Sequence, residues 1–377
     1  MTSVRASQPQ HSSRAHSHAP SRARFLVWFS VLLLVAFASF IAGICLGPTS
    51  VSAPDTMSIL GHHLSQILPG STHSTDPAAT TPWPQDPQKD AIVWQLRTPR
   101  VILAAIVGSA LALAGMVLQA VVRNLLADPY ILGIHSGASC GAAAAIVLGI
   151  GAQFGDYALQ GSAFLGALAA TAVVFGVALS SGKLTSLRVL LTGVAIGYAL
   201  SAATSFLIFA SDSPEASRSI MFWLLGSLGL ANFNGVLLVT LITTAVVAVA
   251  FILLAPRIDA LSSGDATSLA VGINPTTLRA VLLGLSSLLI GVVVAMSGAI
   301  GFIGLIIPHI ARRLVGSKHR WALPISAVLG AILLIWADIL SRVVLAPQEI
   351  PVGIVTALLG APFIIPLIKR AYPASSN

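Results

Sequence analysis

The side chains that could carry chemistry in this sequence are few, because only 8% of its 377 residues are charged. The sequence contains neither the Gly-x-x-x-x-Gly-Lys loop that binds phosphate nor the His-Glu-x-x-His motif of zinc enzymes, and it shows no convincing nucleophile–base set. Its two cysteines, Cys45 and Cys140, lie inside apolar runs without the spacing of a metal site or a disulfide framework. We therefore expect that the chain is not an enzyme and binds no metal ion or cofactor of its own.

A binding function is easiest to see in the polar segment 257–278. This segment contains Gly264-Asp265 and closes with Gly272-Ile-Asn274-Pro. The pattern predicts a short helix, because Asp265 suits the positive N-terminal end of a helix dipole and glycine followed by Asn-Pro stops a helix. Such a helix could seat in a cleft of another subunit and pass on its movement. The same pattern is also compatible with an ordinary connector.

The composition places the elements around this segment in a lipid bilayer. Hydrophobic residues make up 56% of the chain, and the mean hydropathy is +0.91. Soluble domains carry about 25% charged residues, and one core of this size cannot hide so much apolar surface. The formal charge of +8 does not indicate nucleic acid, because the basic residues form short clusters between apolar runs, which suits an anionic membrane surface.

The apolar runs predict an all-α, polytopic transmembrane bundle of about ten helices within residues 25–371, since a span needs about 20 mostly apolar residues. Residues 1–24 are expected to form a disordered cytoplasmic tail. Segment 48–90 is too polar to cross and is assigned to the extracytoplasmic side. The expected spans are 25–47, 100–122, 131–150, 161–181, 188–210, 235–255, 279–297, 301–315, 322–344 and 351–370.

The basic residues predict the orientation. Ten crossings put both termini on one side, and with that side inside, fifteen of the 20 Lys and Arg residues face the cytoplasm. This bias follows the positive-inside rule. It also places 257–278 in the cytoplasm. The five basic residues left outside are Lys89, Arg97, Arg100, Arg218 and Arg342.

Five blocks of residues between about 95 and 370 carry a resemblance to a known family. They are Arg97-Thr-Pro-Arg100-Val-Ile-Leu; Arg123-Asn-Leu-Leu-Ala-Asp128-Pro-Tyr130-Ile-Leu-Gly133 with Ser136-Gly-Ala138; Gly264-Asp265 with Leu269-Ala-Val-Gly272-Ile-Asn274; Ser297-Gly-Ala-Ile-Gly301-Phe-Ile-Gly304-Leu-Ile-Ile-Pro308-His309; and Ala337-Asp338 with Arg342, followed by Glu349-Ile-Pro351-Val-Gly353 through Pro362-Phe363. In type and order they resemble the permease subunits of the ATP-binding-cassette importers for iron siderophores, haem and cobalamin, the type II importers. The sequence departs from the family pattern at His135 and Ala266.

The resemblance implies a dimer of permeases in the inner membrane of a prokaryote, formed by two copies or by a copy and a paralogue. Two partner ATPase subunits would use ATP and magnesium and grip the coupling segment, whose residues are Gly264, Asp265, Leu269, Gly272 and Asn274. An extracytoplasmic binding protein or lipoprotein would deliver a metal chelate and dock on Arg97, Arg100 and Arg342. Alternatively, Arg97 and Arg100 could snorkel to the interface, and Arg342 could pair with Asp338 one helical turn away.

A set of small and helix-breaking residues forms the candidate translocation and gating sites. Glycines let backbones approach closely, and prolines kink helices, although packing alone could also force such bends. The candidates are Gly298, Gly301, Gly304, Pro308, Pro351 and Gly353.

The substrate is expected to be a ferric siderophore, because siderophores are the broadest substrate class of the family; haem and cobalamin are the alternatives. A secondary transporter driven by ions is the main rival. It should carry acidic or histidine relay residues inside the membrane, for which Asp338 and His309 are the candidates.

Overall fold

The computed structural model describes residues 22–67, 86–180 and 185–371, so most of the predicted tail 1–24 lies outside the described residues. The described residues form helices and connections without a strand. The elements are α1 (Arg22–Cys45), α2 (Ala53–Ile67), α3 (Pro87–Asp90), the π-helix η1 (Ala91–Arg97), α4 (Thr98–Val122), the 3₁₀ turn η2 (Pro129–Leu132), α5 (Ile134–Leu148), the 3₁₀ turn η3 (Ala152–Tyr157), α6 (Ala158–Leu179), α7 (Ser186–Phe209), α8 (Pro214–Leu224), α9 (Gly235–Ser262), α10 (Asp265–Ala270), α11 (Pro275–Ser297), α12 (Ile303–Val315), α13 (His319–Val343) and α14 (Val352–Ala371).

Seven of the described helices are long and apolar enough to cross a membrane. They are α1, the continuous helix made of α3, η1 and α4, and the helices α6, α7, α9, α11 and α13. Helices α5 and α14 are shorter and apolar, and α12 has 13 residues. These ten helices correspond to the ten predicted spans, which confirms the all-α polytopic bundle.

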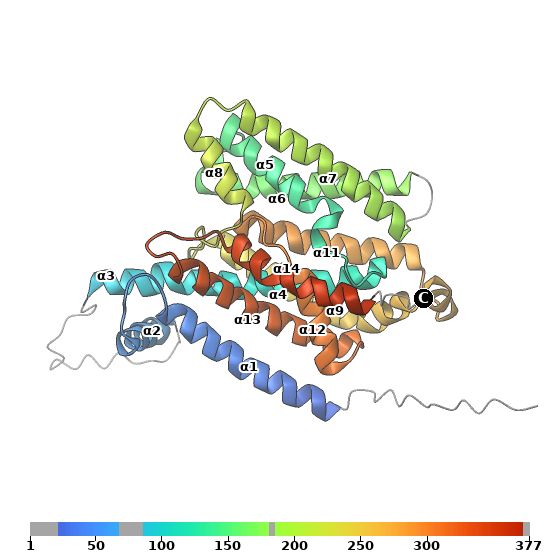
Figure 1. Ribbon diagram of the computed structural model, residues 1–377, viewed down its shortest axis with the longest axis horizontal. Coiled ribbons are helices and arrows are strands. Elements are labelled where there is room, and N and C mark those ends of the chain that lie inside the picture. The colour runs from blue at the N-terminus through green and yellow to red at the C-terminus, as the bar shows by residue number, and fades with distance from the viewer. Residues whose placement is uncertain (1–21, 68–85, 181–184, 372–377) are drawn as a thin grey trace, which may run out of the picture.

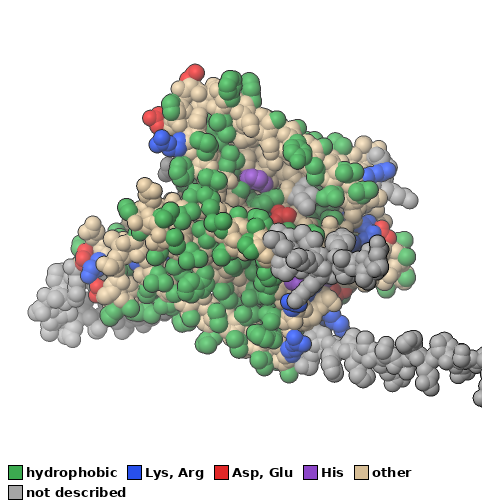
Figure 2. Space-filling model, viewed as in Figure 1, with side chains coloured by type: hydrophobic (Ala, Val, Ile, Leu, Met, Phe, Trp, Pro, Cys, Tyr) green, Lys and Arg blue, Asp and Glu red, His purple; other side chains and the backbone are tan. Residues whose placement is uncertain are grey.

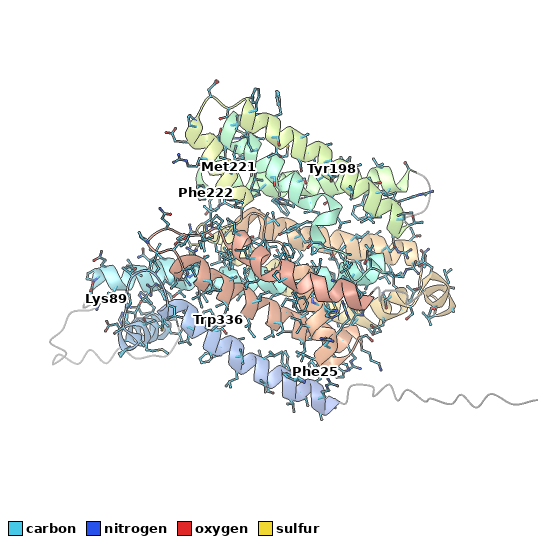
Figure 3. All side chains as sticks on the ribbon, viewed as in Figure 1. Phe25, Lys89, Tyr198, Met221, Phe222 and Trp336 are labelled. Atoms are coloured by element: carbon cyan, nitrogen blue, oxygen red, sulfur yellow. The ribbon has the colours of Figure 1, made fainter. Side chains whose placement is uncertain are left out.

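The bundle has two ends, which lie to the left and right of Figure 1. The short helices α2 and α3 mark one end, called here the α2 end, and α10 marks the other, called the α10 end. Figure 3 labels Lys89 at the α2 end and Phe25 near the start of α1. Hydrophobic side chains cover the middle of the face shown in Figure 2, whereas most acidic and basic side chains of that face lie toward its two ends. This distribution is expected of a protein that crosses a bilayer along the horizontal axis of the view.

Helix α4 lies at the centre of the bundle, and close helix–helix contacts hold it there. A Cβ on Gly108 would clash with the backbone of Gly330 in α13, and one on Gly115 would clash with the carbonyl of Gly304 in α12. Small residues are needed at such crossings because lipid supplies no hydrophobic force between helices, so backbone approach has to supply the packing energy. The remaining helices pack around this core, with α5 to α8 grouped on one side of it (Figure 1).

Several boundaries differ from the predicted ones, mostly at prolines. Helix α9 runs through Pro256 to Ser262, so the connection around α10 spans 263–274 and is shorter than the predicted loop 257–278. The second crossing begins at Pro87 and not at residue 100. Membrane helices tolerate proline because neighbouring groups satisfy the backbone atoms that it frees. The polar segment 48–90 contains α2, which was not expected, and α2 is not among the helices fit to span.

Candidate functional site

Arg97 ends the π-helical segment η1, and its buried guanidinium caps the C-terminal end of α1. It donates hydrogen bonds to the carbonyl oxygens of Ile44 (3.1 Å), Cys45 (3.0 Å) and Thr49 (2.5 Å). The last carbonyls of a helix have no partner within that helix, so donors must come from elsewhere. The positive charge of Arg97 also suits the negative end of the α1 dipole.

Arg342, in the last turn of α13, completes this cap. Its guanidinium donates to the carbonyl oxygens of Leu46 (3.1 Å) and Gly43 (3.0 Å). Its Nε lies 3.0 Å from the Asp338 carboxylate, although its hydrogen bond goes to the Asp338 main-chain carbonyl (3.3 Å). The i, i+4 pair that the sequence offered as an alternative to docking is therefore present. Both side chains are almost fully buried.

Arg100, in the first turn of α4, joins the same cluster from the other side. Its Nε donates to the Asp338 carboxylate (2.8 Å), and its Nη1 donates to both carboxylate oxygens of Glu349 (2.9 and 3.0 Å). Asp338 is thus shared by two arginines. The side chain of Glu349 is 46% exposed, whereas that of Arg100 is 13% exposed, so only this pair reaches the surface.

A cavity of about 360 Å³ opens over this cluster at the α2 end. All three predicted docking arginines and Glu349 line it, so the structure does bring the three arginines together. It also buries two of them, Arg97 and Arg342, and commits their donors to α1. With three arginines and two carboxylates, the cluster keeps one positive charge. Docking of a binding protein there stays a prediction.

Two of the predicted gating residues, Gly298 and Gly353, meet at the connection that follows α8. Gly298 has φ +63° and ψ −158°, and a Cβ there would clash with the Trp223 carbonyl. A Cβ on Gly353 would clash with the Leu225 carbonyl and would lie 2.8 Å from the carbonyl oxygen of Ala299. Glycine is required at both positions because three backbone segments touch. We call this contact the glycine junction. Its main-chain hydrogen bonds are Ser227 N to Ser297 O (2.8 Å) and Val352 N to Gly226 O (3.0 Å).

The stretch from Gly298 to Phe302 leaves the helical path between α11 and α12, and Tyr130 holds it. The Tyr130 hydroxyl accepts a hydrogen bond from the amide of Ile300 and donates one to its carbonyl, both at 2.9 Å. Phe302 has φ +70°, a conformation that costs a bulky residue about 1–3 kcal/mol and persists only where the surroundings enforce it. Tyr130 is in turn positioned by Asp128, whose carboxylate accepts from the Tyr130 amide (2.8 Å).

The other gating candidates have different surroundings. Gly304 packs directly against Pro129 as well as Gly115, and Pro308 is buried inside α12. Gly301 has open space beside its Cα, and Pro351 is half-buried just before α14. Their roles in gating stay predictions.

The short helix expected in the polar segment is present as α10, and Asp265 fixes it to the bundle. Asp265 makes a bidentate ion pair with Arg279 of α11 (2.6 and 3.0 Å) and lies 3.3 Å from Arg123, which caps α4 in the left-handed conformation. The hydrogen-bonded Arg279 guanidinium, with a smaller contribution from Arg123, holds the pKa of Asp265 below its ordinary value. The carboxylate therefore ties α10 to two spanning helices as well as lying at a helix N-terminus.

The remaining residues of the predicted coupling segment shape and expose α10. Gly272 has φ +77° in the turn that follows α10. The Asn274 side chain caps α11 by accepting hydrogen bonds from the amides of Thr276 and Thr277. Leu269 and Val271 are 62% and 60% exposed. Two exposed apolar side chains on a short, anchored helix suit contact with a partner protein.

Sequence reasoning missed side-chain partners that come from a different element of the fold. It did not predict that Arg279 and Arg123 would bind Asp265, nor that Tyr130 would hold Ile300. The available signal was weak: Arg279 is a basic residue near the start of an otherwise apolar helix.

Comparison with known proteins gives a consistent result. Residues 28–370 match the model of the FecCD transport family. The chain is 40% identical to the hemin transport system permease protein HmuU of Yersinia pestis, over 74% of this chain and 83% of that protein. It is 36% identical to the vitamin B12 import system permease protein BtuC of an Escherichia coli strain, over 92% and 95% of the two chains. A solved structure described as a metal-chelate type ABC transporter in an inward-facing conformation matches with a TM-score of 0.75 and 31% identity, over 91% of this chain and 98% of that one.

Replacement of Arg342 by alanine is expected to destabilise the protein by about 3–5 kcal/mol, because it leaves buried Asp338 with one partner fewer and removes the donors to the Gly43 and Leu46 carbonyls at the end of α1. Thermal unfolding in detergent measures the effect. Arg218→Ala, which removes an exposed arginine from α8 at the same end, is the control and should change stability by about 0.5 kcal/mol or less. Equal unfolding midpoints for the two variants would contradict the capping role.

Replacement of Asp265 by asparagine is expected to loosen α10, seen as faster hydrogen exchange of its amides at neutral pH. Because the pKa of Asp265 is lowered in the folded protein, its contribution to stability is fully present above the ordinary pKa of 3.8 and is lost as the pH falls through the folded pKa. Wild-type α10 should therefore loosen only in strong acid. Asp55→Asn, which breaks the Lys89 pair at the α2 end, should leave α10 exchange unchanged. Unaltered α10 exchange in Asp265→Asn would refute the anchoring role.

Proposed function

Because the chain belongs to the FecCD transport family, we propose that it is the membrane permease of an importer that takes up a ferric siderophore, driven by separate ATPase subunits. The family match over residues 28–370 is the observation that carries the importer assignment. The chain is a multi-pass membrane protein and a translocation subunit of an ABC importer. The siderophore, the orientation, the dimer and the partner contacts are the proposed steps.

The α10 end is proposed to face the cytoplasm. The described basic residues at this end of the spanning helices outnumber those at the α2 end, in keeping with the positive-inside rule. They include Arg123 at the end of α4, Arg188 at the start of α7, Arg257 near the end of α9, and Arg312 and Arg313 at the end of α12. Both termini of the chain would then be cytoplasmic.

Helix α10 is proposed to seat in a cleft of the ATPase subunit. Support comes from its exposed Leu269 and Val271 and from the Asp265 ion pairs that anchor it to α4 and α11. The exposed apolar side chains would contact the ATPase subunit, and the ion pairs would pass a displacement of α10 to the spanning helices. The glycine junction is proposed as a gate element, because close backbone contact there lets α11 and α14 move together.

The cavity at the α2 end is proposed to receive an acidic side chain of the extracytoplasmic binding protein. Arg100 is the accessible partner there, since Arg97 and Arg342 are committed to α1. Such pairs steer association and fix register more than they add raw affinity. In the assembled importer, two permease copies, or this chain and a paralogue, would surround the pathway for the chelate.

The relatives are named for the import of different substrates. The relatives are named for hemin, vitamin B12 and, at 36% identity over 75% of this chain, Fe(3+)-citrate import in Bacillus subtilis. A ferric siderophore is our first choice, and haem or cobalamin is the alternative.

The surroundings of Asp338 argue against the rival secondary transporter. A proton or ion relay needs a carboxylate that can bind and release the proton or ion. Asp338 is instead fully buried between Arg100 and Arg342. Its charge is therefore compensated within the protein.

Uptake of labelled ferric siderophore, haem and cobalamin in a permease-deletion strain that retains the cognate ATPase and binding protein tests the function. We expect ATP-dependent uptake of one chelate, and Leu269→Asp should abolish it by placing a charge in the ATPase contact. Val344→Asp, at an exposed apolar residue of the α2 end, is the matched control and should retain uptake. Uptake that follows an ion gradient and persists without the ATPase would overturn the proposal.

The docking proposal predicts opposite effects for the two members of one ion pair. Arg100→Gln should weaken binding of the binding protein to the permease in nanodiscs, because it removes the accessible cation. Glu349→Gln should strengthen binding, because it removes the internal carboxylate that competes for Arg100. Surface plasmon resonance at low and high salt measures both. Effects of the same sign, or no effect, would show that the partner does not use Arg100.

A further inference from the structure

A second cavity, of about 270 Å³, opens at the α10 end and is lined mainly by polar and basic side chains. We call it the basic pocket. It is far larger than the space that one water molecule needs, so it has room for an acidic side chain. The ends of α4, α9 and α12 and the start of α13 form it, and its Arg123 pairs with Asp265 of α10. The lining residues that carry the argument are Gln119, Arg123, Ser262, Arg312, Ser317 and His319.

The charge of Arg312 has no carboxylate partner among the described residues. Within the part of the chain that the structure describes, the hydrogen bonds of its guanidinium go to neutral atoms, the Gln119 side-chain oxygen (2.5 Å) and the Met116 sulfur (3.1 Å). Gln119 is itself fixed, because its amide nitrogen donates to the carbonyls of Gly304 and Leu305. Arg312 is thus held in place by groups that do not compensate its positive charge. Keeping an uncompensated charge away from bulk water costs free energy.

The nearby carboxylates are engaged by other residues. Asp259 accepts from the ring (2.5 Å) and the amide (3.1 Å) of His319, and Asp265 is bound by Arg279 and Arg123. With those pairs formed, the pocket keeps an excess of positive charge. A group that completes it must therefore be anionic and must come from outside the described chain.

We propose that the ATPase subunit places an acidic side chain in the basic pocket, where its carboxylate pairs with Arg312. This inference rests on the proposed function. The pocket borders α10 through Arg123, so a protein that grips the exposed Leu269 and Val271 also covers the pocket mouth. A lipid headgroup is disfavoured, because the lining offers few apolar side chains against which an acyl chain could lie.

The test measures binding of the cognate ATPase subunit to the full permease in nanodiscs at 50, 150 and 300 mM salt. Arg312→Gln should weaken binding at least tenfold at low salt and flatten its salt dependence, and Arg312→Lys should restore part of both. Arg313→Gln removes an exposed arginine next in the chain and is the matched control; its binding should stay within about twofold of wild type.

Unfolding midpoints show whether Arg312→Gln folds. If it does not fold, a second variant still tests the proposal. Ser317→Asp places a carboxylate on an exposed residue at the pocket, where it competes with the incoming side chain without altering Arg312. It should weaken ATPase binding to a similar degree. Unchanged affinity in Ser317→Asp and in folded Arg312→Gln would overturn the proposal.

Two further outcomes separate this inference from its alternatives. If Leu269→Asp abolishes ATPase binding while the pocket variants bind normally, the inference fails and the proposed function stands; if the wild type does not bind the ATPase, the proposed function fails. Each arm is repeated in nanodiscs of phosphatidylcholine and of phosphatidylglycerol. Effects of the pocket variants that occur only with phosphatidylglycerol would identify a lipid phosphate as the occupant and would also overturn the proposal.

Discussion

The buried C-terminal end of α1 sets the constraint that organises the α2 end of the protein. The carbonyls of the last helical turn must find donors inside the protein, because lipid offers none. Two arginines from other helices, Arg97 and Arg342, supply those donors, and Asp338 compensates part of their charge. Charged side chains therefore connect α1, α4 and α13 at this end. Without them, the apolar helices would be held together there only by packing.

Close backbone packing complements these charged contacts through the middle of the molecule. Glycine crossings bring α4 against α12 and α13, and the glycine junction brings α11 against α14 and the connection after α8. Backbone contact leaves no room for adjustment by side chains, so neighbouring helices must move as units or separate. The non-helical stretch before α12 fits this scheme, because the Tyr130 hydroxyl satisfies both backbone groups of Ile300 in place of helical partners.

The sequence predicted the spans well because most of them are apolar runs long enough to be recognised without knowledge of their neighbours. It predicted α10 because glycine and Asn-Pro stop a helix locally. It failed where the determinant is not local. Helix α9 continues through Pro256 since the surrounding bundle accommodates the proline, and Arg100 meets Asp338 across 238 residues. Only the Arg342–Asp338 pair, one turn apart, could be anticipated, and even there the sequence could not show that Arg342 caps α1.

The position of α11 explains how a movement at one end of the bundle can reach the other. Near its start lies Arg279, which donates two hydrogen bonds to Asp265 of α10. Its last residue, Ser297, accepts a main-chain hydrogen bond from Ser227 at the glycine junction. From Arg279 to Ser297 the helix rises by about 27 Å, at about 1.5 Å per residue. Most of the helix is buried, so it cannot bend freely. A displacement of α10 must therefore shift α11 along its length or break the Asp265 ion pair. Shifting the helix costs less free energy than breaking the ion pair if the glycine junction at its far end has a second packing arrangement. A gate that opens and closes requires two such arrangements.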